Sequence, residues 1–226
     1  MSKPNTAEEI YIDLLNRIIS LELEPGQKIS ENAISEVYGV SRSVIRNSFA
    51  RLMQNGFLVV YPQRGTYVSK IDLDYIRTAL LIRIAIEKEM LYRFMTKGNM
   101  KETIKKMEEN VNEQERFYYA SEYISEFKEL DEAFHECIIL SVENKNVLKT
   151  LNDKLLHISR WRKVYVKSGY RISHLVDEHK EILAAIKDND VSRAMDCMSK
   201  HIDTISAVIG FNKEFLHYVR SEERRV

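Results

Sequence analysis

The residues that most constrain the fold of this chain are its helix breakers, because they gather at one end. The 226 residues include three prolines and seven glycines, and seven of these ten lie between Pro4 and Gly65. Only Gly98, Gly169 and Gly210 follow. Glycine and proline are unfavourable inside helices and mark turns. We therefore expect many turns before residue 70 and long helices after it.

Apolar spacing and capping signals divide the first part of the chain into helices and a hairpin. Ile10, Leu14 and Ile18 recur every four residues, which is the spacing of one helix face. Another helix is expected between the N-cap Ser41 and the stop signal Asn55-Gly56. The expected helices cover residues 6–20, 31–38 and 41–55, and the segments FLVVY and TYVSK are expected to pair as strands. This order predicts a winged helix-turn-helix.

The segment from Ser41 to Lys70 is positively charged, although the whole chain has no formal net charge. It contains five basic residues and no acidic residue, whereas the preceding 40 residues carry three basic and seven acidic residues. Arg42 and Arg46 lie at the leading end of the third helix, and Arg64 lies at the tip of the hairpin. Arginines at these places can bind the phosphates and base edges of double-stranded DNA. The segment therefore predicts a DNA-recognition helix followed by a wing.

The rest of the chain has the pattern of a helical bundle. Its expected helices cover residues 72–97, 100–118, 122–142, 146–166, 173–187 and 191–218. Helices that are joined by short connections pack as antiparallel neighbours. We expect a mainly α protein with two domains: a winged helix-turn-helix at residues 1–70, and an antiparallel bundle of about six helices at residues 71–226.

Four polar residues of the expected bundle have the spacing of a metal site. Asp131 and His135 lie one helical turn apart on the same face. His179 and His201 are expected at the same level of a helical hairpin that turns at residues 188–190. One carboxylate and three imidazoles suit a divalent ion such as Zn, Ni, Mn or Fe. Spacing alone leaves open a hydrogen-bonded polar core, which is the commoner role of buried histidines.

Other classes of protein find little support in the sequence. The motif HExxH and a glycine-rich phosphate loop are absent. A di-iron enzyme needs two Glu-x-x-His motifs that meet, and those at residues 132–135 and 214–217 are expected far apart. Cys137 and Cys197 have no CxxC partner, which excludes a thiolate metal site. No apolar run reaches the ~18 residues of a membrane span and no signal pattern is present, so we expect a cytoplasmic protein without membrane contact.

The N-terminal part resembles a known DNA-binding domain. Its turn Pro25-Gly26 and the runs Gly39-Val40-Ser41-Arg42, Val44-Ile45-Arg46 and Arg64-Gly65-Thr66-Tyr67-Val68 are similar to the DNA-binding domain of the GntR family of bacterial transcriptional regulators. The resemblance implies that operator DNA is touched by Ser41, Arg42, Arg46 and Gly65. It adds Ser43, Arg64 and Thr66 as further DNA-binding candidates.

The bundle resembles the FCD effector domain of the FadR subgroup of that family. The resemblance rests on Asp131-Glu132-Ala133-Phe134-His135, on Glu178-His179 and on the segment from Ala194 to His201. It implies a divalent metal ion beside a cavity that binds a small organic acid, with Zn expected and Ni or Mn as alternatives. The implied metal ligands are Asp131, His135, His179 and His201.

A further match concerns the opening helix of the bundle. Arg83 and Glu87 fit the Arg-x-x-x-Glu pattern of the subgroup. Arg83 is therefore an effector-binding candidate that could hold a carboxylate, and the alternative is a pair with Glu87 that only stabilises the helix. His157, Arg160 and Arg162 are polar candidates to which the sequence assigns no place.

These resemblances imply a transcriptional repressor and not an enzyme. A homodimer would place its two winged helix-turn-helix domains on a palindromic operator. A small acid bound in the bundle would change the distance between these domains. A metal-dependent enzyme built in the bundle is the alternative, and turnover of a small acid would support it. A third possibility is an architectural DNA binder whose bundle only dimerises.

Overall fold

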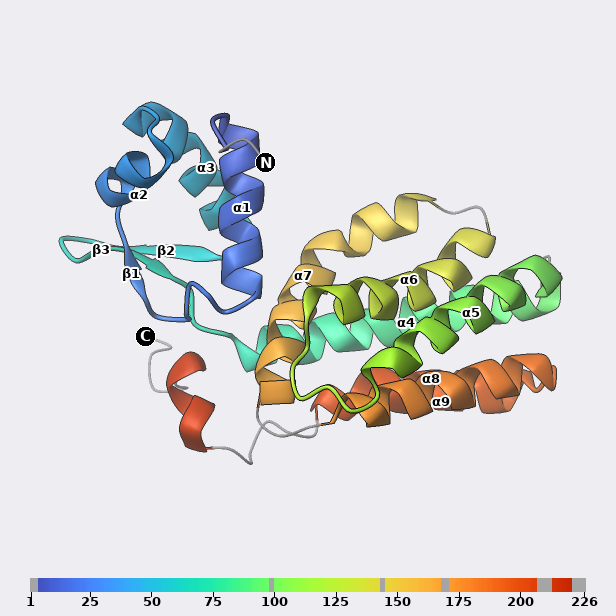
Figure 1. Ribbon diagram of the computed structural model, residues 1–226. Coiled ribbons are helices and arrows are strands. Elements are labelled where there is room, and N and C mark those ends of the chain that lie inside the picture. The colour runs from blue at the N-terminus through green and yellow to red at the C-terminus, as the bar shows by residue number, and fades with distance from the viewer. Residues whose placement is uncertain (1–3, 98–99, 143–144, 168–170, 207–212, 221–226) are drawn as a thin grey trace. The chain divides into compact units, whose positions relative to one another are not determined.

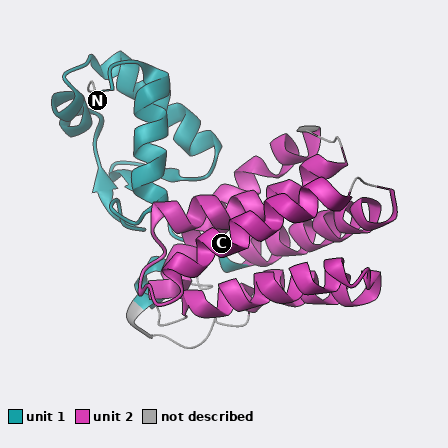
Figure 2. Cartoon of the chain, turned by 45° about the vertical axis from the view of Figure 1, so that its right-hand side comes forward, with its two compact units in different colours: residues 1–73, 212–226 teal, residues 74–211 magenta. Residues whose placement is uncertain are grey.

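The structure is a computed structural model that describes residues 4–97, 100–142, 145–167, 171–206 and 213–220 (Figure 1). It is mainly helical with one small antiparallel sheet, as the sequence predicts. The chain forms two compact units, which comprise residues 1–73 with 212–226 and residues 74–211 (Figure 2). The second unit is thus inserted into the sequence of the first.

The first unit is a winged helix-turn-helix. Its helices are α1 (Ala7–Ile19), α2 (Glu31–Tyr38) and α3 (Arg42–Gln54), and its strands are β1 (Lys28–Ile29), β2 (Leu58–Tyr61) and β3 (Gly65–Val68). The central strand is β3, which pairs antiparallel with both others. The expected helices and hairpin are confirmed, whereas β1 is too short to give a sequence pattern.

Apolar packing and caps explain these helices. Ile10 and Leu14 of α1 and Ile45 and Leu52 of α3 are fully buried where the two helices pack. Burial of each such side chain contributes about 1.5–3 kcal/mol. The start of α1 carries a capping box in which Thr6 and Glu9 satisfy each other's backbone amides.

The turn between β2 and β3 forms the tip of the wing. Gln63 has a φ of 60° and Gly65 a φ of 103°, both in the left-handed region. A side chain at Gly65 would also place its Cβ 3.1 Å from the Lys28 Cε. Glycine relieves both constraints, so the tip can turn tightly and leave Arg64 exposed.

The second unit is a bundle of helices. They are α4 (Leu73–Lys97), α5 (Met100–Gln114), α6 (Ser125–Ser141), α7 (Lys145–Lys167), α8 (Ile172–Lys187) and α9 (Val191–Asp203), with 3-10 turns η1 (Glu115–Phe117) and η2 (Thr204–Ser206). The expected hairpin of α8 and α9 is present, and the Asp190 side chain caps α9 by accepting from the Arg193 amide at 3.0 Å. Within the described ranges, no helix is long and apolar enough to cross a membrane.

The prediction for the last helix is wrong beyond Asp203. The expected helix 191–218 ends as α9 at that residue, continues as the 3-10 turn η2, and is followed by residues 207–212, which lie outside the described ranges. Residues 204–210 read TISAVIG, in which four of the seven residues are β-branched and one is glycine, so its mean helix propensity is weak. The break is therefore visible in propensity, although the apolar periodicity continues across it.

The described end of the chain returns to the first unit. It forms the 3-10 helix η3 (Lys213–Tyr218), and Val219 then makes a parallel bridge with Ile71. The Ile71 amide donates to the Tyr218 carbonyl at 2.9 Å, and the Arg220 amide donates to the Ile71 carbonyl at 2.9 Å. The Tyr218 hydroxyl donates to Glu24 Oε1 at 2.8 Å. The chain's end is therefore part of the winged helix-turn-helix unit.

Candidate functional site

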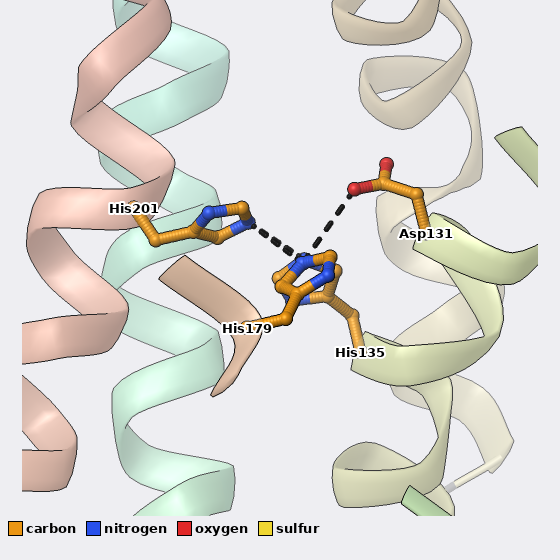
Figure 3. A group of neighbouring side chains, drawn as sticks. All are labelled: Asp131, His135, His179 and His201. Carbon is orange, nitrogen blue, oxygen red and sulfur yellow. Dashed lines mark hydrogen bonds and ion pairs between the residues drawn. The ribbon is translucent and has the colours of Figure 1, made fainter. Parts of the chain in front are cut away.

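Four buried polar side chains meet in the core of the second unit. They are Asp131 and His135 of α6, His179 of α8 and His201 of α9 (Figure 3). One potential ligand atom from each lies within 4.8 Å of all the others, and none of the four residues is more than 3% exposed. The sequence spacing on three helices therefore corresponds to a real cluster.

The inner atoms of the cluster are the three Nε2 nitrogens and one carboxylate oxygen. His201 Nε2 lies 3.1 Å from His135 Nε2 and 3.2 Å from His179 Nε2 (Figure 3). His179 Nε2 lies 3.6 Å from Asp131 Oδ1. These atoms face one another across a space that is small enough for one ion to contact all of them.

Each imidazole is held from outside by an oxygen atom. The acceptors are Glu87 Oε2 at 2.6 Å from His135 Nδ1, Gln114 Oε1 at 2.7 Å from His179 Nδ1, and Glu178 Oε2 at 2.7 Å from His201 Nδ1. Because these oxygens accept, each Nδ1 carries the proton and each Nε2 presents a lone pair inward. This is the tautomer that a histidine needs in order to bind a metal ion through Nε2.

The outer oxygens are fixed in turn by further contacts. Glu87 Oε1 accepts from Arg83 Nε at 2.5 Å, and Glu178 Oε1 accepts from the Thr204 hydroxyl at 3.0 Å. Gln114 donates through its amide nitrogen to Asn110 Oδ1 at 2.6 Å, which orients its oxygen toward His179. The orientation of the imidazoles is therefore built into the fold.

The protonation states also suit a cation. Burial lowers the pKa of His179 and His201 well below the ordinary value, so both are neutral at pH 7. Burial opposes the charge of Asp131, but Arg162 and the histidines outweigh this effect and hold the pKa of Asp131 below its usual range. The cluster thus combines three neutral nitrogen donors with one carboxylate, a donor set typical of Zn, Ni or Mn sites.

One buried oxygen of the cluster lacks a hydrogen-bond partner. Asp131 Oδ2 accepts from the Tyr123 hydroxyl at 2.7 Å and pairs with Arg162 Nη1, whereas Asp131 Oδ1 has no hydrogen-bond partner. A buried carboxylate oxygen and three converging lone pairs are costly without a positive charge between them. A divalent metal ion therefore fits the four residues.

A cavity of about 90 Å³ adjoins the cluster. Asp131 and His135 form part of its wall, and Ile139, Leu148 and Leu155 contribute apolar surface. Its polar lining residues include Arg83, Tyr123, Asn152, Ser159 and Arg162. Such a cavity, mostly apolar with a few convergent polar groups, has the form of a small-molecule site.

Arg83 pairs with Glu87, and its role in binding an effector stays a prediction. Its side chain is buried, and it also lines the cavity. Arg162, to which the sequence assigns no place, lines the same cavity from α7. Sequence analysis misses Gln114 and Glu178 as partners of the histidines, because these contacts depend on how each helix is rotated against its neighbours.

The DNA-binding candidates lie on α3 and the wing of the first unit. Arg42 and Arg46 have side chains that are 60% and 64% exposed, and both approach Glu31 Oε2, at 3.5 and 3.3 Å. The Ser41 hydroxyl does not cap α3 as expected, because it lies 2.8 Å from the Ser43 hydroxyl instead. Glu31 is the residue that sequence analysis misses here.

At the wing, Arg64 lies over the Tyr61 ring, 5.8 Å from its centroid. Gly65 and Thr66 begin β3, and Gly65 is exposed while Thr66 is half-buried. The candidates on α3 and those on the wing thus belong to one compact unit.

Comparison with known protein families gives two matches. Residues 6–68 match the family described as bacterial regulatory proteins, gntR family, and residues 79–204 match the FCD domain. The second match alone spans more than half of the chain, and together they cover both the exposed arginines of α3 and the buried cluster.

Similar proteins include named transcriptional regulators. An uncharacterized HTH-type transcriptional regulator in an unstable DNA locus of Streptomyces ambofaciens is 29% identical over 87% of this chain and 82% of its own length. The HTH-type transcriptional repressor RspR of Escherichia coli is 27% identical over 88% of this chain and 86% of its own. A crystal structure of a GntR regulator from Rhodococcus superposes with a TM-score of 0.73 at 18% identity, over 92% of this chain and 99% of that one, which shows the shared fold.

Proposed function

Because the chain belongs to the GntR family of bacterial transcriptional regulators and carries an FCD domain, we propose that it is a cytoplasmic repressor that binds a palindromic operator as a homodimer and responds to a small organic acid. Its relatives are regulators and repressors by name, not enzymes. Glu132 of the Glu-x-x-His motif pairs with Lys128 at 2.9 Å, so it does not support a di-iron site.

The observation that carries this proposal is the buried cluster beside the cavity. Asp131, His135, His179 and His201 would hold a divalent metal ion, with Zn expected and Ni or Mn as alternatives. When bound, the metal would supply a positive charge that attracts an acidic oxygen of the effector. Arg83 would bind an effector carboxylate from its side of the cavity.

The first unit would read the operator. Arg42 and Arg46 are exposed at the leading end of α3 and can reach base edges in a major groove, while Ser41 and Ser43 can bind phosphate oxygens. Arg64, Gly65 and Thr66 would contact the backbone from the wing. Glu31 would hold the two arginines of α3 side by side before DNA displaces it.

A dimer is supported by the character of α4. Its central segment, LLIRIAIE, is apolar on nearly every side apart from Arg83 and Glu87, which are buried. On the outside of the helix, Leu81 is 67% exposed and Tyr92 is 46% exposed. A helix that is apolar all round is normally covered on all sides, so α4 offers a face for a second copy of the chain.

The test is native mass spectrometry of untagged protein that is purified without chelator. We expect a dimer with one metal ion per chain. The variant His179→Gln should lose the metal, and the control His174→Gln, an exposed histidine of the same helix, should keep it. If the wild-type protein carries no metal, the four residues form only a hydrogen-bonded polar core. If the protein binds DNA tightly as a monomer, the proposed dimer is wrong.

A further inference from the structure

The side of α3 opposite its buried residues carries a stripe of exposed side chains. The stripe consists of Ser43, Arg46, Asn47 and Ala50. The buried residues of the same helix include Ile45, Phe49 and Leu52, which pack into the core of the first unit. Spacings of three and four residues place the members of the stripe on one helix face, over about two turns. This face is the part of α3 that is open to a ligand of the first unit.

Asn47 is the polar residue of this stripe whose functional group is not engaged. The Ser43 hydroxyl lies 2.8 Å from the Ser41 hydroxyl, and Arg46 approaches Glu31 Oε2 at 3.3 Å. Among the residues that the structure describes, none forms a hydrogen bond or an ion pair with the Asn47 side chain. Its amide therefore presents two N–H donors and one acceptor oxygen to the solvent.

The fold of the first unit gives no reason for asparagine at this position. Asparagine is less favourable inside a helix than alanine, glutamate or lysine, and an exposed position can hold any of these residues. The Asn47 amide makes no hydrogen bond within the first unit that would offset this cost. A polar group with these properties, between residues that are candidates for DNA binding, is expected to have its partner outside the chain.

The amide of asparagine matches one base in the major groove of DNA. Its oxygen can accept from adenine N6 while its nitrogen donates to adenine N7, and no other single base presents this donor and acceptor together. Arginine matches guanine in a similar way. Arg46 and Asn47 are consecutive, so they lie about 1.5 Å apart along the helix axis, against about 3.4 Å for one base-pair step. Their side chains can therefore reach neighbouring base pairs.

The surroundings of Asn47 allow α3 to approach a groove closely. Ala50 follows Asn47 by three residues on the same face, and its side chain is a single methyl group. The segment from Ser41 to Lys70 contains no acidic residue that would repel phosphates. The short Asn47 side chain can then reach the base edges at the floor of the groove.

We infer that Asn47 reads an adenine of the operator, in a base pair next to the one that Arg46 contacts. This inference rests on the proposed function, since it assumes that the first unit binds operator DNA through α3. Asn47 is then a specificity-determining residue, because an asparagine that contacts a base edge distinguishes sequences, whereas one that contacts a phosphate does not.

The test measures base preference at every position of one operator. The operator is selected from randomised double-stranded DNA with the full chain, and each of its base pairs is then replaced in a panel of duplexes. Fluorescence anisotropy at one fixed salt concentration gives the affinity for each duplex. The wild-type protein should prefer adenine at one position by about 5- to 150-fold, the range for one bidentate base contact.

Two variants assign this preference to Asn47. Asn47→Ala removes the amide, so the preference for adenine should fall to within about twofold while the preferences at other positions remain. Asn47→Asp keeps the shape but replaces the N–H donors by an oxygen, so it should also lose the preference. Alanine is favourable in a helix, so Asn47→Ala should fold normally. The matched control is Asn16→Ala, which removes an exposed asparagine of α1 and should keep every preference.

The panel separates a base contact from a phosphate contact. A uniform loss of affinity for all duplexes in Asn47→Ala would indicate a phosphate contact and overturn the inference. A panel that Asn47→Ala leaves unchanged, or an Asn47-dependent preference for another base, would also overturn it. These three results leave the proposed function intact. If the wild-type protein enriches no DNA sequence, the proposed function and this inference are both wrong.

Discussion

At the scale of single residues, Arg42 and Arg46 share one carboxylate. Glu31 approaches both guanidinium groups on the surface, where ion pairs contribute little to stability. The two ion pairs of Glu31 therefore affect where the arginine side chains lie more than they affect the free energy of folding. They hold two long side chains near the leading end of α3, where a groove of DNA would meet them.

The variant Arg46→Ala should weaken binding to the cognate operator by roughly 5- to 150-fold, the range for loss of one base contact. Fluorescence anisotropy at one fixed salt concentration measures this effect. Arg116→Ala serves as the control, since Arg116 is an equally exposed arginine of the second unit. Wild-type affinity in Arg46→Ala would remove this residue from the proposed interface.

The buried histidines make the stability of metal-free protein depend on pH. Burial lowers the pKa of His179 and His201 below 6.5, so the unfolded chain takes up protons before the folded chain does as the pH falls. The metal-free protein should therefore lose stability below about pH 6.5. Urea unfolding at pH values from 8 to 5 measures the free energy of unfolding. The variant His179→Gln should lose less of this free energy as the pH falls. A stability that does not change with pH would contradict the burial of neutral histidines.

The sequence predicts the cluster because helical spacing determines which residues share a face. Asp131 and His135 are one turn apart, and the turn at residues 188–190 sets His179 level with His201. The partners Glu87, Gln114 and Arg162 are not predictable in this way. They meet the cluster through the packing of α4, α5 and α7, and the rotation of one helix against another depends on side-chain shapes.

At the scale of elements, two serines at helix starts have different roles. The Ser30 hydroxyl accepts from the Ala33 amide at 3.2 Å and caps α2, whereas the Ser41 hydroxyl at the start of α3 contacts Ser43. Both fit the sequence signal for an N-cap equally well. Only the structure separates a capping serine from one that is available to a ligand.

The variants Ser30→Ala and Ser41→Ala should therefore act on different properties. Ser30→Ala should destabilise the first unit by about 1 kcal/mol through loss of the cap. Ser41→Ala should leave stability nearly unchanged and weaken operator binding. Chemical unfolding and DNA titration of both variants measure the two effects. Equal loss of stability in the two would show that Ser41 also caps its helix in solution.

Helix boundaries are predictable where breakers mark them. Gly39, the stop Asn55-Gly56 and the cap Asp190 each end or begin a helix in the structure. The end of α9 is mispredicted because apolar residues continue past Asp203 without a proline or glycine until Gly210. Periodicity indicates a buried face, and it does not distinguish a regular helix from a 3-10 turn.

At the scale of the whole molecule, the chain's end stabilises the first unit. The Tyr218 side chain is 4% exposed and its hydroxyl bonds Glu24. Tyr218→Phe should lower the free energy of unfolding of this unit by about 1 kcal/mol, and Tyr218→Ala by about 3 kcal/mol or more, since the larger change also leaves a cavity. Thermal unfolding followed by circular dichroism measures both.

The control for this prediction is Tyr119→Phe, because Tyr119 is 94% exposed and belongs to the second unit. It should leave the unfolding free energy unchanged. Metal content should be the same in all three tyrosine variants, since none of them touches the buried cluster. Wild-type stability in Tyr218→Ala would show that the returning segment is not docked in solution.

Because residues 213–220 pack on the first unit, this unit can complete its fold only after the bundle has been synthesised. The ribosome releases α1 to β3 first, but the partners of Ile71 and Glu24 follow only after the whole inserted bundle. At about 5–20 residues per second, the roughly 150 intervening residues take about 7–30 s to synthesise. During that time the nascent winged helix-turn-helix lacks its last segment. A ribosome that stalls while it translates the bundle would thus hold a winged helix-turn-helix that has formed without its C-terminal segment.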